Sequence, residues 1–155
     1  LLAKVCAALN DTAGEREALL TIASREGDAL DAVTRLLALA EAEKNWNETI
    51  RWAEAWLAIN PLAPTPWRSL LTAHEAIADV ETIAAGTVAA TDRAASKTAR
   101  QSAIAAGNTL LQLAPPDVAS IHYRVARQLQ KVDTTAARRH VLLALAEAPR
   151  YRDAY

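Results

Sequence analysis

The chain has 155 residues, of which 52% are hydrophobic and 5% aromatic, and its formal net charge is −1. This length is enough to bury a core, no apolar run approaches the roughly 20 residues of a membrane span, and the balanced charge argues against nucleic acid as a partner. Ala occurs 37 times and Gly only 4 times. Because no segment alternates apolar and polar residues, we predict an all-α protein.

The ends of the chain suggest a longer parent. The sequence begins at Leu1 without an initiator Met and stops at Tyr155, directly after a turn signal. We therefore expect a piece of a longer protein, whose other domains are candidate partners. Cys6 is the only cysteine, so no disulfide can form within this sequence.

Three helices are predicted before residue 60, over 13–25, 28–44 and 47–59, preceded by the tail of another over 1–10. Capping and turn residues separate them, namely Asn10-Asp11-Thr12, Gly27-Asp28 and Asn45-Trp46-Asn47. Pro61, Pro64 and Pro66 then forbid further helix. The third helix is rich in tryptophan, and we predict that Trp52 and Trp56 pack between hairpins.

Five more helices are predicted downstream. Their expected ranges are 67–78, 80–91 with Asp79 as its cap, 97–113, 118–131, and a last helix that follows the Asp133-Thr134 turn and stops before Pro149. Only a weak break, Asp92 to Ser96, separates the second of these from the third.

Two glycines fall inside these predicted helices. Each of them, Gly86 and Gly107, costs ~1 kcal/mol relative to Ala in a helix. We expect a close helix–helix approach or a kink at these positions, with a ligand contact as the alternative.

Apolar patterns repeat at a constant offset along the chain. Val33-Leu36-Leu37-Ala40 recurs 34 positions later as Trp67-Leu70-Leu71-His74, and the same offset separates Pro115 from Pro149. This period is that of helix–turn–helix repeats. Pro115 follows Pro61 by 54 positions, which predicts one extra helix inserted within 80–113.

Over about residues 28–148 the chain resembles the tetratricopeptide repeat (TPR) family. The first helix of a unit is represented by the two patterns above and by His122-Val125-Ala126-Leu129. The second helix and its closing proline are represented by Thr49-Ala53-Trp56-Pro61, Ala103-Gly107-Leu110-Pro115 and Ala137-Val141-Ala144-Pro149. Leu37 and Leu71 stand where the family has a small residue, which only Ala126 keeps.

The resemblance implies a right-handed α-solenoid of antiparallel helical hairpins, with about eight or nine helices in a single domain over 1–155. Its clearest repeats would be 28–61, 64–92 and 97–149, with one inserted helix.

The resemblance also implies that first helices line a concave groove that binds peptides. Tyr123, Arg124 and Arg127 are the best groove candidates, because a guanidinium can donate two parallel hydrogen bonds to a carboxylate. The remaining candidates on the same faces are Ser120, Lys131, Arg68 and Thr72. The alternative is that these residues form an ordinary solvated helix face.

Nothing in the sequence predicts catalysis, a cofactor or a metal. His74-Glu75 opens like the zinc-protease HExxH motif, but Ala78 occupies the second histidine position. His122 and His140 lie elsewhere in the sequence, and no glycine-rich phosphate loop is present. We therefore predict a protein that is not an enzyme.

Charge is distributed unevenly along the chain. Residues 1–92 carry 7 basic and 14 acidic side chains, a balance of −7, whereas residues 93–155 carry 10 and 4, a balance of +6. We predict a non-catalytic scaffold that binds a protein or peptide, including an acidic one. Two alternatives remain: a purely structural helical spacer within a larger enzyme, and self-assembly in which acidic and basic halves meet.

Overall fold

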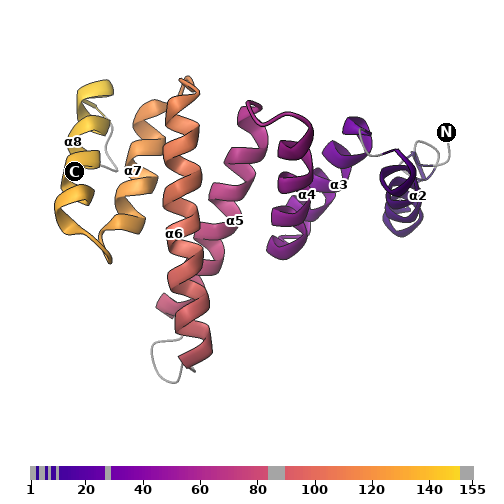
Figure 1. Ribbon diagram of the computed structural model, residues 1–155, viewed down its shortest axis with the longest axis horizontal. Helices are drawn as coiled ribbons and strands as arrows, with labels where there is room; N and C mark the ends of the chain where they lie inside the picture. Colours follow the sequence, from indigo (N-terminus) through magenta and orange to yellow (C-terminus); the bar gives the residue numbers. More distant parts are fainter. Residues whose placement is uncertain are drawn as a thin grey trace. The chain divides into compact units, whose positions relative to one another are not determined.

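The structure, a computed structural model, describes residues 11–26, 29–83 and 90–150, together with residues 3, 6, 8 and 9; the side chains of residues 80–93 are not described. Within these ranges the chain forms seven α-helices, α2 to α8, and no strand (Figure 1). The prediction of an all-α protein is confirmed, whereas eight or nine helices were expected. None of the described helices is both long and apolar enough to cross a membrane.

The helices fall into two compact units, Leu1–Pro61 and Leu62–Tyr155. The first contains α2 (Thr12–Arg25), α3 (Leu30–Ala42) and α4 (Trp46–Ile59). The second contains α5 (Pro64–Ile83), α6 (Ala90–Gln112), α7 (Val118–Leu129) and α8 (Thr134–Glu147).

In the first unit, α3 packs against both α2 and α4. The predicted apolar stripe on α3 supplies the core, since Leu36, Leu37 and Ala40 are all buried. On α4 the buried residues include Trp52 and Ala53, whereas Trp56 is half-buried. Helical spacing of apolar residues therefore identified the inner face of α3 correctly.

An ion pair between a buried carboxylate and an exposed guanidinium joins α2 to α3 in the same unit. Glu15 of α2 is buried, and Arg35 donates from Nε to Oε1 at 2.6 Å and from Nη2 to Oε2 at 3.0 Å. These hydrogen bonds hold the pKa of Glu15 below its ordinary value, although burial of the carboxyl acts in the opposite direction.

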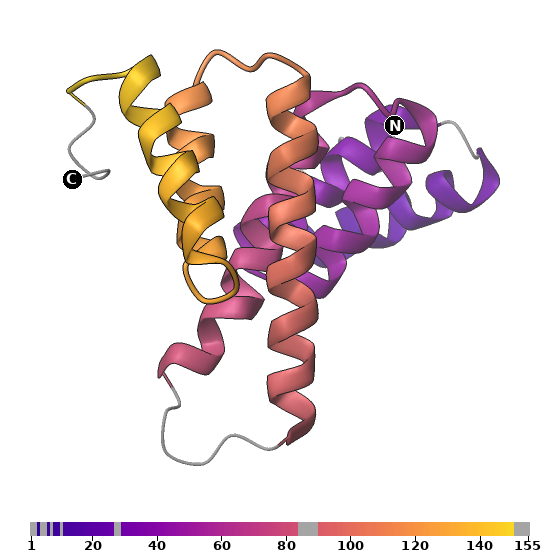
Figure 2. The same ribbon diagram turned by 60° about the vertical axis from the view of Figure 1, so that its left-hand side comes forward.

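In the second unit, α5 and α6 form one long hairpin, which reaches past the ends of α7 and α8 (Figures 1 and 2). Hydrogen bonds join α5 to α6 in this hairpin. The Ala78 carbonyl on α5 accepts one from Ser96 Oγ at 3.1 Å and one from Arg100 Nη2 at 3.4 Å. Both Ser96 and Arg100 are buried.

This hairpin corrects the prediction for 79–96. Asp79 was expected to cap a new helix but lies inside α5, and the break expected over Asp92 to Ser96 is wrong because α6 runs through it. Residues 92–96 contain no Pro or Gly, and their alanines favour helix. The extra residues therefore lengthen a hairpin. Residues 84–89, which include Gly86 and part of the helix expected over 80–91, lie outside the described residues, as do Gly27-Asp28 and most of 1–10.

Three of the predicted caps are confirmed. Asp11, Asn45 and Asp133 each accept a hydrogen bond from a backbone N–H in the first turn of α2, α4 and α8. Such caps satisfy donors that have no partner within the helix. Asp117 precedes α7 in the same way but makes no side-chain cap hydrogen bond.

Gly107 marks a close approach between α6 and α7. A Cβ at this position would lie 2.4 Å from Cγ2 of Val125, and Val125 is itself buried. The expected close helix–helix contact is therefore present at Gly107, where only a residue without a side chain fits.

Candidate functional site

Charged side chains join α5 to α7 along one face of the second unit. We use the name α5–α7 face for the set Arg68, Thr72, Glu75, Asp79, Asp117, Arg124 and Arg127. Three arginine–carboxylate pairs connect its two sides, and each pair joins residues 48 or 49 positions apart in the sequence.

Helical geometry explains the alignment. Arg68, Glu75 and Asp79 are separated by 7 and 4 positions, so they lie on one side of α5. Asp117, which directly precedes α7, and Arg124 and Arg127 within that helix are separated by 7 and 3 positions. Because the partners advance together along the chain, α5 and α7 run parallel to each other.

In the first pair, the Arg68 guanidinium donates hydrogen bonds to both carboxylate oxygens of Asp117. Nη1 donates to Oδ2 at 2.6 Å, and Nη2 donates to Oδ1. This fork raises the pKa of Arg68 and lowers that of Asp117. Asp117 uses its side chain here, which explains why it makes no cap hydrogen bond to α7.

The second pair is the least exposed. Arg124 donates from Nη2 and Nε to Glu75 Oε2, at 2.6 and 3.0 Å, and from Nη2 to Thr72 Oγ1 at 2.9 Å. The exposed fractions of the Arg124 and Glu75 side chains are 24% and 11%. Breaking this pair would leave a largely desolvated charge without its partner.

The third pair lies closer to solvent. Arg127 Nη2 donates to Asp79 Oδ2 at 2.9 Å, and the two side chains are 46% and 42% exposed. An ion pair with this exposure contributes little to stability, but both of its side chains can be reached by a partner.

Four of the predicted groove residues come together on this face: Arg68, Thr72, Arg124 and Arg127. Ser120 and Tyr123 are half-buried on α7, and Lys131 follows that helix in an exposed turn. The pairing of these arginines with Asp117, Glu75 and Asp79 was not predicted from the sequence. The signal that could have found it is the repeated offset of 48 or 49 positions between opposite charges on two predicted helices.

The pairs also change the interpretation of the uneven charge. Glu75 and Asp79 belong to the acidic part of the sequence, and Arg124 and Arg127 belong to the basic part. Their pairing within one molecule means that part of the complementary charge is already used inside the chain.

A second constellation, unpredicted, joins α7 to α8. His122 Nδ1 lies 3.0 Å from His140 Nδ1, and their ring centroids are 5.1 Å apart. Burial lowers the pKa of both imidazoles, and the nearby Glu147 carboxylate acts in the opposite direction on His122. Both rings are therefore predominantly neutral near pH 7.

The first unit carries an open hollow of about 480 Å³ between α2 and α4. Its lining includes Leu20 of α2 together with Arg51 and Trp52 of α4. The Arg51 guanidinium stacks over the Trp52 ring at 4.7 Å, and the Trp52 indole donates to Glu48 Oε2 at 2.8 Å. On the α4 side of the hollow, Arg51, Trp52 and Glu48 therefore interact with one another.

Among the described residues, no group of three or more His, Cys, Asp or Glu side chains is arranged to hold a metal ion. Comparison of the sequence with models of known protein families gives no match, and comparison with curated proteins gives none either.

Proposed function

We propose that this chain is a non-catalytic scaffold of the TPR type, a right-handed α-solenoid that binds a peptide segment or a partner domain on the α5–α7 face. The observation that carries the proposal is the set of three arginine–carboxylate pairs, which holds two first helices of successive hairpins side by side.

The helix boundaries support the repeat. Three consecutive hairpins, α3–α4, α5–α6 and α7–α8, follow one another in the sequence, and the first residues of α3 and α5 are 34 positions apart. The first residues of α5 and α7 are 54 positions apart, and the 20 additional positions lengthen the α5–α6 hairpin. Parallel first helices, as found for α5 and α7, are the arrangement expected when repeats stack.

Preorganisation supports binding. A surface whose side chains are already ordered loses less conformational entropy when a partner binds. Each guanidinium carries five N–H donors, and a carboxylate that accepts two of them leaves others for the backbone carbonyls of a peptide.

The pairs also define the preferred partner. A purely acidic peptide has to compete with Asp117, Glu75 and Asp79 for the arginines. A segment that carries both charges can bind the solvent-exposed side of a pair without breaking it. Its acidic groups would then lie near Arg127 and its basic groups near Asp79. We therefore propose a mixed-charge segment as the preferred ligand.

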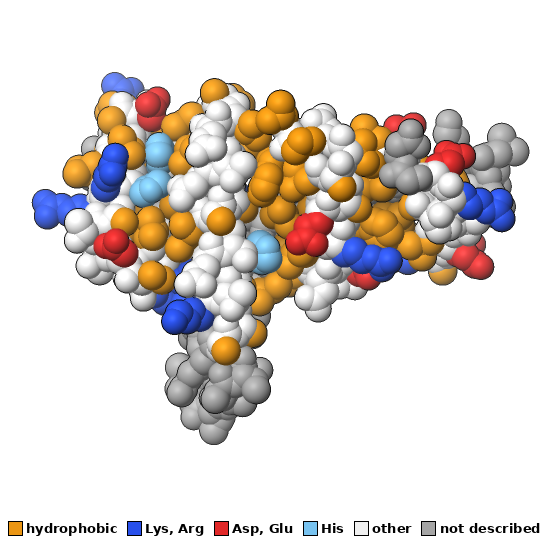
Figure 3. Space-filling view, viewed as in Figure 1, with side chains coloured by type: hydrophobic (Ala, Val, Ile, Leu, Met, Phe, Trp, Pro, Cys, Tyr) orange, Lys and Arg blue, Asp and Glu red, His pale blue; other side chains and the backbone are white. Residues whose placement is uncertain are grey.

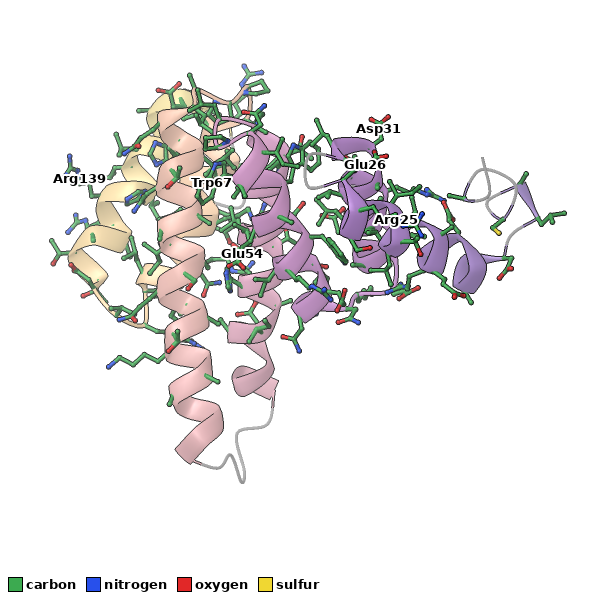
Figure 4. The ribbon with its side chains drawn as sticks, turned by 45° about the vertical axis from the view of Figure 1, so that its right-hand side comes forward. Arg25, Glu26, Asp31, Glu54, Trp67 and Arg139 are labelled. Carbon is green, nitrogen blue, oxygen red and sulfur yellow. The ribbon has the colours of Figure 1, made fainter. Side chains whose placement is uncertain are left out.

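Fluorescence anisotropy tests this proposal with three labelled peptides of equal length that are acidic, basic and mixed in charge. We expect the mixed peptide to bind most tightly, and binding to weaken in Arg124→Glu/Arg127→Glu and in Thr72→Trp, which adds bulk without removing a charge. The matched control is Arg138→Glu/Arg139→Glu on α8, where Arg139 points away from the helices (Figure 4).

Equal binding by the wild type and both face variants would remove the α5–α7 face as the site. If no peptide binds any variant, the spacer alternative is favoured. Circular dichroism shows whether each variant retains its helices.

A further inference from the structure

We propose that His122 and His140 form a two-histidine site for a divalent late transition metal, with Cu²⁺ preferred, across the α7–α8 hairpin. The site is independent of the α5–α7 face, and the peptide-binding proposal does not depend on it.

The fold places the two histidines together by symmetry about a turn. Both are 9 positions from Lys131, which lies in the turn between α7 and α8. In an antiparallel helical hairpin, residues equally distant from the turn lie at the same height on facing helices. The two imidazoles meet for this reason, although they are 18 positions apart in the sequence.

The atoms that meet are ligand atoms. His122 Nδ1 and His140 Nδ1 are 3.0 Å apart, so in the metal-free protein one donates its proton to the other. When both rings carry their proton on Nε2, the Nδ1 lone pairs of both rings are free for a shared metal ion. Metal binding therefore needs a tautomer change in one neutral ring and a small rotation of the rings that turns both lone pairs toward the metal, with no net loss of a proton.

The separation of these atoms also favours a particular geometry. With metal–nitrogen bonds of about 2.05 Å, two nitrogens 3.0 Å apart subtend about 94° at the metal. This angle is close to the 90° between neighbouring ligands in square-planar or tetragonal coordination, which is typical of Cu²⁺ and Ni²⁺. A tetrahedral Zn²⁺ would require the nitrogens to lie about 3.3 Å apart.

The surroundings leave room for further ligands. Both histidines are half-buried, and Figure 3 shows histidine surface, in pale blue, on the part of the molecule where Figure 1 places α7 and α8. Since no third protein ligand belongs to the set among the described residues, water or an external ligand would occupy the remaining positions. Cu²⁺ binds nitrogen sites of this kind more tightly than the other first-row divalent ions.

The experiment is a titration of the untagged full chain with Cu²⁺, followed by calorimetry and by electron paramagnetic resonance. We expect one equivalent to bind through two imidazole nitrogens. His122→Gln and His140→Gln should each weaken binding by more than about tenfold, since even an outer-shell partner contributes 10–100-fold. The matched control is His74→Gln, which changes the remaining one of the three histidines. This variant should bind Cu²⁺ as tightly as the wild type.

Coupling to a single imidazole in the wild type, or equal Cu²⁺ affinity in His122→Gln/His140→Gln, would overturn the proposal. The resonance spectrum of the wild type decides the matter even where a variant fails to fold. If the two histidines form only a hydrogen bond within the hairpin, the variants will have a lower melting temperature than the wild type, and Cu²⁺ will not change the melting temperature of the wild type. This outcome would also overturn the proposal.

Discussion

Individual arginines on the α5–α7 face differ in what their pairing contributes. Arg124 and Glu75 are largely shielded from water, with three hydrogen bonds between them. Arg127 and Asp79 share one hydrogen bond near the surface. Burial of the pair therefore determines which carboxylate is structural and which remains available to a partner.

A comparison of two isosteric substitutions tests this difference. Glu75→Gln should lower the free energy of unfolding by about 2 kcal/mol, because it leaves the Arg124 charge without a buried counter-ion. Asp79→Asn removes an equivalent charge from the exposed pair and should cost less than about 1 kcal/mol. Urea unfolding measures both. Equal losses in the two variants would contradict the assignment.

The Glu15–Arg35 pair should make the free energy of unfolding depend on pH in the acidic range. Because hydrogen bonding lowers the pKa of Glu15 in the folded state, the unfolded state binds the proton more readily, and stability falls as the pH falls. The contribution is complete above the unfolded value of about 4.3 and disappears as pH falls through the lower folded value. Glu15→Gln should be less stable than the wild type at pH 6, and the difference should shrink below about pH 4. A difference that does not change with pH would contradict this origin.

At the scale of elements, the contact between α6 and α7 depends on the missing side chain of Gly107. Helix propensity alone predicts that Gly107→Ala stabilises by ~1 kcal/mol. The new methyl would lie 2.4 Å from Val125 Cγ2, and overpacking of a rigid, β-branched neighbour costs typically about 1–3 kcal/mol.

We therefore expect Gly107→Ala to destabilise the protein, despite its better propensity. Val125→Ala removes the clashing atom, so Gly107→Ala/Val125→Ala should lose less stability than the two single changes together. Denaturant unfolding of the wild type and the three variants measures the four free energies of unfolding that this double-mutant cycle requires. Additive losses would show that the methyl does not meet Val125.

Helices with an apolar stripe or a capping residue were predictable from the sequence, as α2, α3, α4, α7 and α8 show. The long hairpin was not, because Asp79 and Asp92 are residue types that favour helix starts. Their local preference was overridden in α5 and α6, and the Asp79 side chain pairs with α7 instead.

The sites were harder to predict than the helices. Arginines at helical spacing on residues 124 and 127 were found, but their partners lie 48 or 49 positions away. The pairing of His122 with His140 was also missed, since it follows only once the turn between α7 and α8 is known. Local patterns carry information on helices, whereas these contacts depend on which helices become neighbours.

For the whole molecule, the pairs on the α5–α7 face weaken the argument for charge-driven self-assembly. Two acidic groups of the N-terminal part and two basic groups of the C-terminal part neutralise each other within the chain. We expect light scattering to give the mass of a single chain at both about 0.01 M and 1 M salt, where the screening length changes from about 30 to 3 Å. A larger mass that appears only at low salt would support self-assembly.

The proposal that the α5–α7 face binds a peptide is tested most directly by hydrogen–deuterium exchange of the full chain with and without the mixed-charge peptide. We predict slower exchange in α5 and α7 when the peptide is bound, no change in α8, and loss of the effect in Thr72→Trp. Protection confined to α2 and α4, around the open hollow, or no protection at a saturating peptide concentration, would contradict it.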